Sequence, residues 1–379
     1  EDLFLWEINA QFPIQANDGS PAYPHLGELH NPAPIVRASN QGSDETWLAV
    51  VPNGINSASG ATVLYLVNLS DGTRHQEIVL STESGGGLNA ATAIDLDGDL
   101  TVDRIYAGDL RGRVWRLDRD PESALFYSHY ASNGEPLPFF QIDPDGTDSA
   151  STRSIFSGFA ISELPGRSTE NGLVIHFGTA SNAPAINSLF AVWDNNEAPL
   201  NGTGLLIDRW FEESEISDTR IRTVAGPPIH YQSGANHGWK IDLPDPGEFL
   251  LGTPVRYLDR LVFSSRTFID PDAQDPCLNQ SAGWILAVDA DSGLGPTAAV
   301  LDIDDDGLID SSDLATDLSA PSGIKLEGKS PSAPVIHRIN TGPESRLVRV
   351  EADTDAAIDV RALPLSPHRL AWRRLEDLD

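Results

Sequence analysis

The feature that most constrains the fold is a short apolar segment opening with small residues, which recurs five times along the chain. A second apolar segment follows each one, and a third usually comes next. Short apolar or alternating runs between Gly, Asn, Asp and Pro turns are typical of β-strands, and helical periodicity is scarce. The first segments are Asn31–Val36, Leu88–Leu96, Phe156–Ser162, Leu250–Leu258 and Ser330–Arg338. The second segments are Trp47–Asn53, Arg104–Asp109, Leu173–Ala180, Arg260–Ser265 and Arg346–Glu351.

This repeat predicts an all-β protein built from similar small sheets. One four-stranded sheet cannot bury both of its faces, so neighbouring sheets must cover them. The first strand of each sheet, with its small residues, fits nearest a crowded central axis. Because the spacing between first strands is uneven, we expect a single irregular (modified) β-propeller of about six to eight blades with long loop insertions. A degenerate blade near Ile221–Leu243 would also explain the spacing, and an array of two-sheet sandwiches is the competing architecture.

The charge of the chain limits its partners. The formal net charge is −31, which repels nucleic acid phosphates and anionic lipid headgroups. A surface this acidic suits divalent cations and a salty or extracellular setting, although simple solubility explains it equally well. No run approaches the roughly 18–20 apolar residues of a membrane span, so we expect no direct membrane insertion. Cys277 is the single cysteine, which excludes a disulfide within the chain and a cysteine-rich zinc site.

Two aspartate loops carry the clearest chemical signal. In both, acidic oxygens occupy positions 1, 3, 5 and 9, an alternation that lets a tight turn gather carboxylates around one cation. The backbone carbonyl at position 7 is expected to add a further oxygen. We call Asp95–Asp103 the first aspartate loop. Its predicted calcium ligands are Asp95, Asp97, Asp99, Thr101 and Asp103.

The second aspartate loop, Asp302–Asp313, is the stronger match to a calcium loop. Gly307 stands at position 6, where an EF-hand loop turns sharply, and position 12 is acidic. The alternative for both loops is a solvated acidic turn, but closely spaced carboxylates repel one another without a cation. The predicted Ca²⁺ ligands of the second loop are Asp302, Asp304, Asp306, Leu308, Asp310 and Asp313.

Catalytic patterns are weak, which predicts that the chain is not an enzyme. The nine histidines are scattered, and no H-E-x-x-H zinc motif, G-x-S-x-G elbow or glycine-rich phosphate loop occurs. His176 lies within an apolar strand and is interpreted as a packed residue. The eight tryptophans are interpreted as packing anchors within blades in preference to platforms for sugars.

The segment Ala93–Asp118, AIDLDGDLTVDRIYAGDLRGRVWRLD, resembles the hallmark stretch of the PilY family of type IV pilus biogenesis and tip-adhesin proteins. There an aspartate loop leads into a Y-A-G-D-L-x-G-x-x-W-R-F-D-like run, and Leu117 stands where phenylalanine is usual. Further segments follow in the family's order: Ser188–Asn195, Gly238–Glu248, Asp275–Gly293, the second aspartate loop and Leu370–Leu375. The resemblance implies one domain, residues 1–379, from the C-terminal end of a longer secreted precursor.

The resemblance also implies a function. Family members prime and tip type IV pili and support twitching motility and surface attachment. In this family the calcium loop that resembles Asp302–Asp310 is implicated in controlling pilus extension against retraction. The implied partners are type IV pilus components (minor pilins) and host or abiotic surfaces, and the implied location is the cell surface at the pilus tip. A periplasmic quinoprotein-like propeller enzyme and a carbohydrate-binding propeller are the alternatives.

Overall fold

The fold is almost entirely β-structure, as the sequence predicts. Within the residues that the structure describes, the one helical element is a short 3-10 helix, Ser311–Asp313. No helix in this described part is long and apolar enough to cross a membrane. The computed structural model describes residues 6–8, 22–39, 46–123, 125–144, 153–181, 186–267, 282–304, 306, 308–315, 317–326, 331–334, 336–340, 346–352 and 356–362.

The first sheet is an antiparallel unit in the order β1-β2-β3-β4. Its strand β3 is buried on both faces, because Leu64 and Leu66 enter one apolar cluster while Val63, Tyr65 and Val67 enter another. A strand apolar on both sides must be covered twice, which places this sheet between other parts of the chain. The strands are β1 (Ile35–Ser39), β2 (Thr46–Pro52), β3 (Thr62–Asn68) and β4 (Arg74–Ser81).

The second sheet repeats this arrangement and packs on the first. Trp115 and Leu117 of β7 share one apolar cluster with Leu48 and Leu64 of the first sheet. Trp115 is 1% exposed, which confirms its predicted burial. The strands are β5 (Leu88–Ile94), β6 (Arg104–Asp109), β7 (Arg113–Arg119) and β8 (Phe126–Ser128), extended by β11 (Phe140–Gln141) and β16 (Leu200–Asn201). A separate hairpin is formed by β9 (Tyr130–Ser132) and β10 (Glu135–Leu137).

The third and fourth units share one eleven-stranded sheet. The third contains β12 (Ser154–Ile155), β13 (Ala160–Glu163), β14 (Leu173–Ala180), β15 (Ser188–Asp194) and β19 (Gly238–Asp242). The fourth contains β20 (Phe249–Tyr257), β21 (Arg260–Thr267), β22 (Ala282–Asp289) and β23 (Gly323–Leu326). Trp284 of β22 is fully buried, as predicted.

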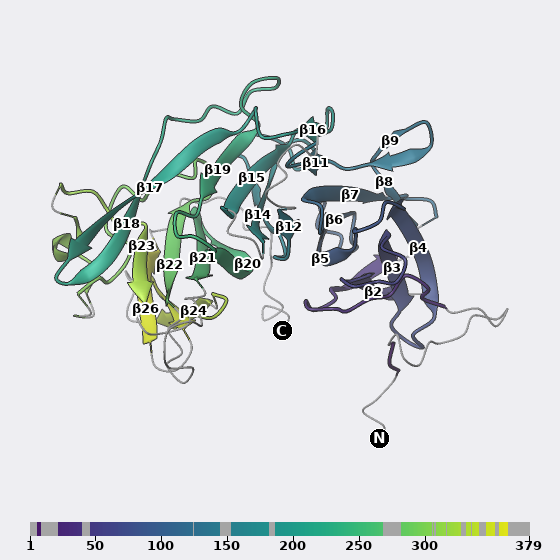
Figure 1. Ribbon diagram of the computed structural model, residues 1–379, viewed down its shortest axis with the longest axis horizontal. Coiled ribbons are helices and arrows are strands. Elements are labelled where there is room, and N and C mark those ends of the chain that lie inside the picture. Colours follow the sequence, from purple (N-terminus) through teal and green to yellow (C-terminus); the bar gives the residue numbers. More distant parts are fainter. Residues whose placement is uncertain are drawn as a thin grey trace.

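A long hairpin joins these two units at their outer strands (Figure 1). It consists of β17 (Ile207–Ile216) and β18 (Thr219–Ala225). Strand β17 pairs in parallel with β19, and β18 pairs antiparallel with β23. Residues Ile221–Leu243, the region of the possible degenerate blade, therefore contribute strands β18 and β19 to the shared sheet and form no separate blade.

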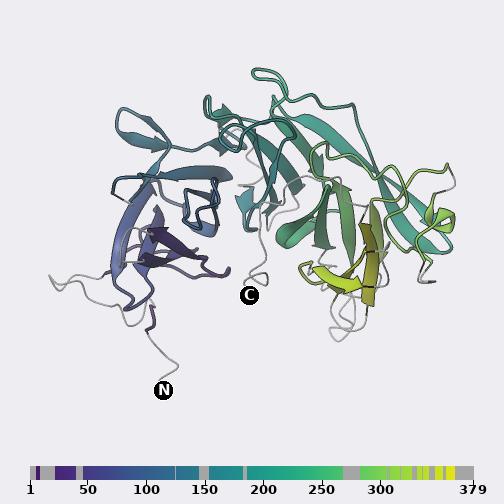
Figure 2. The same cartoon turned by 180° about the vertical axis from the view of Figure 1, so that it is seen from behind.

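The strand groups follow one another in chain order around an arc, from β2–β4 to β24 and β26 (Figures 1 and 2). The fifth group is a three-stranded sheet of β24 (Ile336–Asn340), β25 (Arg346–Ala352) and β26 (Ala356–Ala362). The second segment of each predicted repeat forms the strand next to the first one. Five such groups lie within the described residues, whereas a count of six to eight blades stays a prediction.

Candidate metal centres

The first aspartate loop connects β5 to β6 at the end of their antiparallel pairing. The Asp103 amide donates to the Ile94 carbonyl at 2.9 Å, which closes the loop at its base. Two residues within the loop, Gly98 and Leu100, have φ values of 80° and 70°. This left-handed backbone lets the chain curl tightly enough for alternate side chains to face one point.

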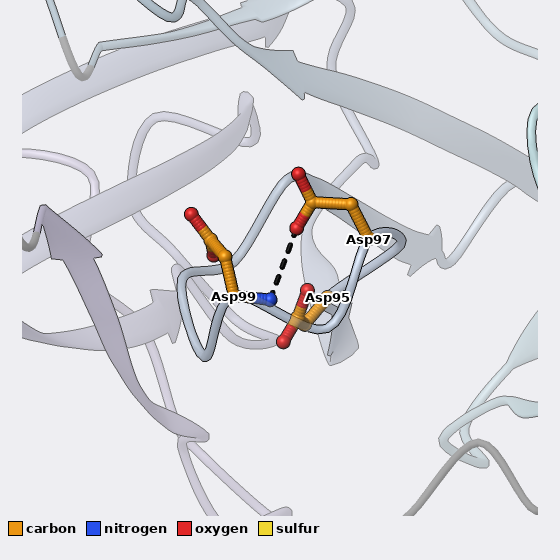
Figure 3. Close-up of side chains that lie close together, drawn as sticks. All are labelled: Asp95, Asp97 and Asp99. Atoms are coloured by element: carbon orange, nitrogen blue, oxygen red, sulfur yellow. Dashed lines mark hydrogen bonds between the residues drawn. The ribbon is translucent and has the colours of Figure 1, made fainter.

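Three carboxylates of this loop converge, as Figure 3 shows for Asp95, Asp97 and Asp99. One oxygen from each lies within 4.8 Å of the others. Backbone amides of the same loop hold these carboxylates. Asp95 accepts from Gly98 and Leu100, both at 2.8 Å, and Asp97 accepts from the Asp99 amide at 3.1 Å. The loop therefore presents three oriented acidic oxygens at the surface.

The other two predicted ligands of the first loop have different surroundings. Asp103 accepts from the Leu96 amide at 2.8 Å and pairs with the Arg119 guanidinium at 3.1 Å, so it braces the base of the loop. The Thr101 side chain is buried, at 1% exposed. The structure does not group either residue with the three carboxylates, and their predicted role as ligands stays a prediction.

Arg37 of β1 also holds the first loop, and sequence reasoning missed it. Its guanidinium donates to the Asp99 carbonyl at 3.0 Å and to the Leu100 carbonyl at 3.2 Å. The Val102 amide in turn donates to the Arg37 carbonyl at 2.9 Å. These three contacts tie the loop of the second sheet to the first sheet. No local sequence signal reveals them, because Arg37 lies about sixty residues away along the chain.

The second aspartate loop lies in the connection between β22 and β23. Oxygens of Asp302, Asp304 and Asp306 lie within 4.8 Å of one another. Asp302 is buried, at 8% exposed, while the other two side chains face solvent. The Leu308 amide donates to Asp306 at 2.7 Å, the same short-range contact that orients the first loop. Gly307, predicted to make the sharp turn, lies outside the described residues.

Asp310 and Asp313 form a capping box at the start of the 3-10 helix, with Asp310 as its N-cap. Asp310 accepts from the Ser312 amide at 2.8 Å, and this hydrogen bond lowers the pKa of Asp310 below its ordinary value. Asp313 is fully buried and accepts from the Ile303 amide at 2.6 Å and the Asp310 amide at 2.9 Å. These contacts give both acids a structural role, and metal coordination by them stays a prediction.

The donor chemistry of both clusters fits a hard divalent cation. Three carboxylates at this separation repel one another by about 1 kcal/mol per pair in water, and by more where water is excluded. Calcium takes six to eight oxygen ligands, so backbone carbonyls and water would complete either shell. In each cluster, the carboxylates would bind the ion and bring their oxygens together around it. Neither cluster contains the imidazole or thiolate ligands that zinc favours.

His176 has the surroundings of a structural residue. It is fully buried in β14, and one of its ring nitrogens lies 2.9 Å from the Ser162 hydroxyl. Burial lowers the pKa of His176 to about 3, so the ring is neutral at physiological pH. A Ser–His pair without access for a substrate lacks what nucleophilic catalysis requires.

The fold defines a class of protein, a β-propeller-like module, and two of its loops carry acidic clusters that could hold a metal ion. Comparison with known families is more specific. Residues 3–196 match the family model described as the PilY1 beta-propeller domain, and the chain belongs to this family. The resemblance noted in Ala93–Asp118 is thereby confirmed.

Individual relatives agree with this assignment. The chain is 28% identical to a type IV pilus biogenesis factor PilY1 homolog of Xylella fastidiosa, covering 77% of this chain and 20% of that protein. It is 26% identical to the type IV pilus biogenesis factor PilY1 of Pseudomonas aeruginosa, covering 81% and 28% respectively. The chain thus spans between a fifth and three tenths of these relatives.

A solved structure supports the fold. The crystal structure of the Pseudomonas aeruginosa PilY1 C-terminal domain superposes with a TM-score of 0.72. The alignment covers 94% of this chain and 74% of that one, at 19% sequence identity. At this identity the likeness establishes the β-propeller-like architecture alone.

Proposed function

We propose that this chain is the calcium-binding propeller module of a type IV pilus biogenesis factor and tip adhesin. The convergence of three carboxylates in each aspartate loop is the observation that carries the calcium part. The relatives named as pilus biogenesis factors support the pilus part. In this role the module is non-catalytic and helps to set pilus extension against retraction, and so twitching motility and surface attachment.

Calcium would act on the connections between strands. In the first loop, the ion would neutralise two of the three converging charges and fix the β5–β6 connection, which Arg37 ties to the first sheet. In the second loop, the ion would order the segment that precedes the 3-10 helix. Since such loops open locally, loss of the ion would change these surfaces while the sheets stay folded.

The proposed partners are minor pilins and, through the whole protein, host or abiotic surfaces. The proposed location is extracellular, at the pilus tip, after passage through the periplasm and the outer membrane. The strongly negative chain, with a net charge of −31, is compatible with the high calcium of such a setting.

Calcium titration of the purified chain by calorimetry tests the metal sites. We expect binding in the range of about 10⁻⁴–10⁻³ M, which suffices for an extracellular module. Asp97→Asn should weaken the first site about tenfold or more, and Asp304→Asn should do the same to the second. Each removes one charge from its cluster but keeps an oxygen acceptor. Asp317→Asn, at an exposed acid outside both clusters, is the matched control.

The same variants in the full-length protein test the pilus role. Asp304→Asn and Asp310→Ala should reduce surface pili or twitching, while Asp310→Lys, which places a fixed positive charge in the loop, should retain pili that respond poorly to calcium. Because Asp310 also caps the 3-10 helix, Asp304→Asn is the cleaner variant. Calcium binding that is indifferent to Asp97→Asn and Asp304→Asn would refute the metal sites. Normal pili and twitching in every variant would refute the regulatory role.

A further inference from the structure

A shallow cavity lies over strands β17 and β19, and no residue of either aspartate loop lines it. Its volume is about 370 Å³, which falls within the range of about 300–1,000 Å³ of small-molecule sites. The cavity is open to solvent and mixes apolar with charged groups. The side chains that matter here are Ile186, Asp208, Trp210, Lys240, Asp242 and Pro244.

The parallel pairing of β17 and β19 gathers the polar groups on one face. Asp208 lies opposite Lys240 in the register, and alternate residues of a strand share a face. Asp208 and Trp210 of β17 therefore lie beside Lys240 and Asp242 of β19. Arg209, between Asp208 and Trp210, also lines the cavity but is only 3% exposed, and its guanidinium donates to the Ser292 carbonyl at 2.7 and 2.8 Å.

Three charged groups of the cavity hold one another in place. The Lys240 ammonium lies 2.8 Å from an Asp208 oxygen and 3.3 Å from an Asp242 oxygen. The Ser188 hydroxyl donates to the other Asp242 oxygen at 2.6 Å. The Asp208 and Asp242 side chains are nevertheless 69% and 42% exposed, so each carboxylate still faces solvent. They form a fixed pair of acceptors for a ligand rich in hydroxyl donors.

Trp210 supplies an aromatic platform beside these acceptors. Its side chain is 49% exposed, whereas Trp115, Trp239 and Trp284 are buried, so the interpretation of tryptophans as packing anchors does not describe it. The indole N–H donates to Glu212 at 3.3 Å, which restrains the ring. The face of an indole ring is electron-rich and attracts the weakly positive C–H groups of a sugar ring.

We propose that this cavity binds a neutral pyranose sugar. The sugar ring stacks on Trp210, and its hydroxyls donate to Asp208 and Asp242. Acidic sugars are disfavoured by the two exposed carboxylates and by the net charge of −31; Arg209 also lines the cavity, but it is only 3% exposed and its guanidinium is bonded to the Ser292 carbonyl. A quaternary ammonium ligand, the other common partner of an exposed indole, is disfavoured because Lys240 already lies between the carboxylates.

This site is independent of the calcium proposal, so either can fail without the other. The test titrates the chain with the methyl pyranosides of glucose, galactose, mannose and N-acetylglucosamine, read by saturation-transfer NMR and calorimetry. We expect at least one to bind with a Kd of about 1 mM, as suits so small a ligand. Methyl glucuronide and choline serve as the charged comparison ligands.

Variants assign the binding to the cavity. Trp210→Ala should weaken binding at least tenfold, while Trp210→Tyr, which keeps an aromatic face, should stay within severalfold of the parent. Asp242→Asn should also weaken it severalfold. Trp47→Ala removes another half-exposed indole, 45% exposed in β2, and should leave binding unchanged. The proposal is overturned if no neutral pyranoside binds, if Trp210→Ala binds as well as the parent, or if choline or the glucuronide binds in preference.

Discussion

Asp291 shows at the scale of a single residue how the fold changes the chemistry of a carboxyl group. It lies in the turn after β22, and burial, reinforced by the nearby Asp289 and Asp259 carboxylates, raises its pKa to about 6. The Arg256 guanidinium opposes this shift only in part. The pKa of an unfolded aspartate stays near 3.8. Folding therefore disfavours the charged form of this group.

The raised pKa of Asp291 makes the free energy of unfolding depend on pH. Between about pH 4 and pH 6 the folded chain keeps a proton that the unfolded chain has lost, so the free energy of unfolding falls as the pH rises through this window. Asp291→Asn removes the ionisation and should raise the free energy of unfolding at pH 7.5 by about 1–3 kcal/mol. Urea unfolding of the parent and the variant at pH 7.5 and at pH 3.5 measures this difference in the free energy of unfolding. A gain that persists unchanged at pH 3.5 would contradict this explanation.

The connection between β5 and β6 illustrates the scale of the element. Leu100 stands at position 6 of the first aspartate loop, where an EF-hand loop places an invariant glycine. Its φ of 70° is left-handed, and its side chain is 68% exposed. A left-handed conformation costs an L-residue roughly 1–2 kcal/mol, and the exposed leucine recovers little by packing. The tight turn that brings the carboxylates together therefore includes a strained backbone conformation at Leu100.

Relieving this strain should stabilise the protein. Leu100→Gly is expected to raise the free energy of unfolding by about 1 kcal/mol, partly offset by the greater freedom of glycine in the unfolded chain. Leu100→Asn, which also tolerates this backbone, should stabilise in the same direction. Thermal and urea unfolding supply the measurement. Leu137→Gly, in strand β10 at an ordinary φ, should destabilise instead; stabilisation by both glycine variants would exclude the strain argument.

At the scale of the whole molecule, buried charges join one sheet to the next. Asp194 of β15 is fully buried, and both of its oxygens lie 3.0 Å from the Arg116 guanidinium of β7. The Tyr106 hydroxyl of β6 donates to the same carboxylate, and Arg104 lies 3.5 Å away. Asp118 of β7 pairs with both guanidinium groups as well, at 2.8 Å from Arg104 and 2.6 Å from Arg116, so two carboxylates, two cations and a phenol join the second and third units.

Asp194→Asn keeps the shape of this junction but leaves Asp118 as the remaining carboxylate shared by Arg104 and Arg116. We expect a loss of about 1–3 kcal/mol in the free energy of unfolding, because the variant removes the charged acceptor of the Arg116 and Tyr106 hydrogen bonds while Asp118 still pairs with both arginines. Urea unfolding measures the loss. The control is Asp218→Asn, at an exposed turn residue with a φ of 67° that asparagine adopts readily. A change as small as that of the control would show that the junction is held by apolar packing alone.

Much of this structure follows from the sequence alone. The alternation of small, apolar and turn residues predicts the strands, because a strand buried on both faces must be apolar throughout. The first and second segments of all five repeats contain strands that pair with each other. The spacing of Asp95, Asp97 and Asp99 likewise predicts their convergence, since alternate side chains of a tight loop point to one side. These are local relations, encoded within a few residues.

Contacts between distant segments were decided only by the tertiary structure. The β17–β18 hairpin joins two sheets through a parallel pairing with β19 and an antiparallel pairing with β23, which no short motif specifies. Arg37 reaches the first aspartate loop, and Trp210 comes to lie beside Lys240, only because separate strands are neighbours in space. A local pattern predicts which faces of a segment are buried. Which distant strand or side chain covers those faces depends on how the whole chain buries its apolar surface.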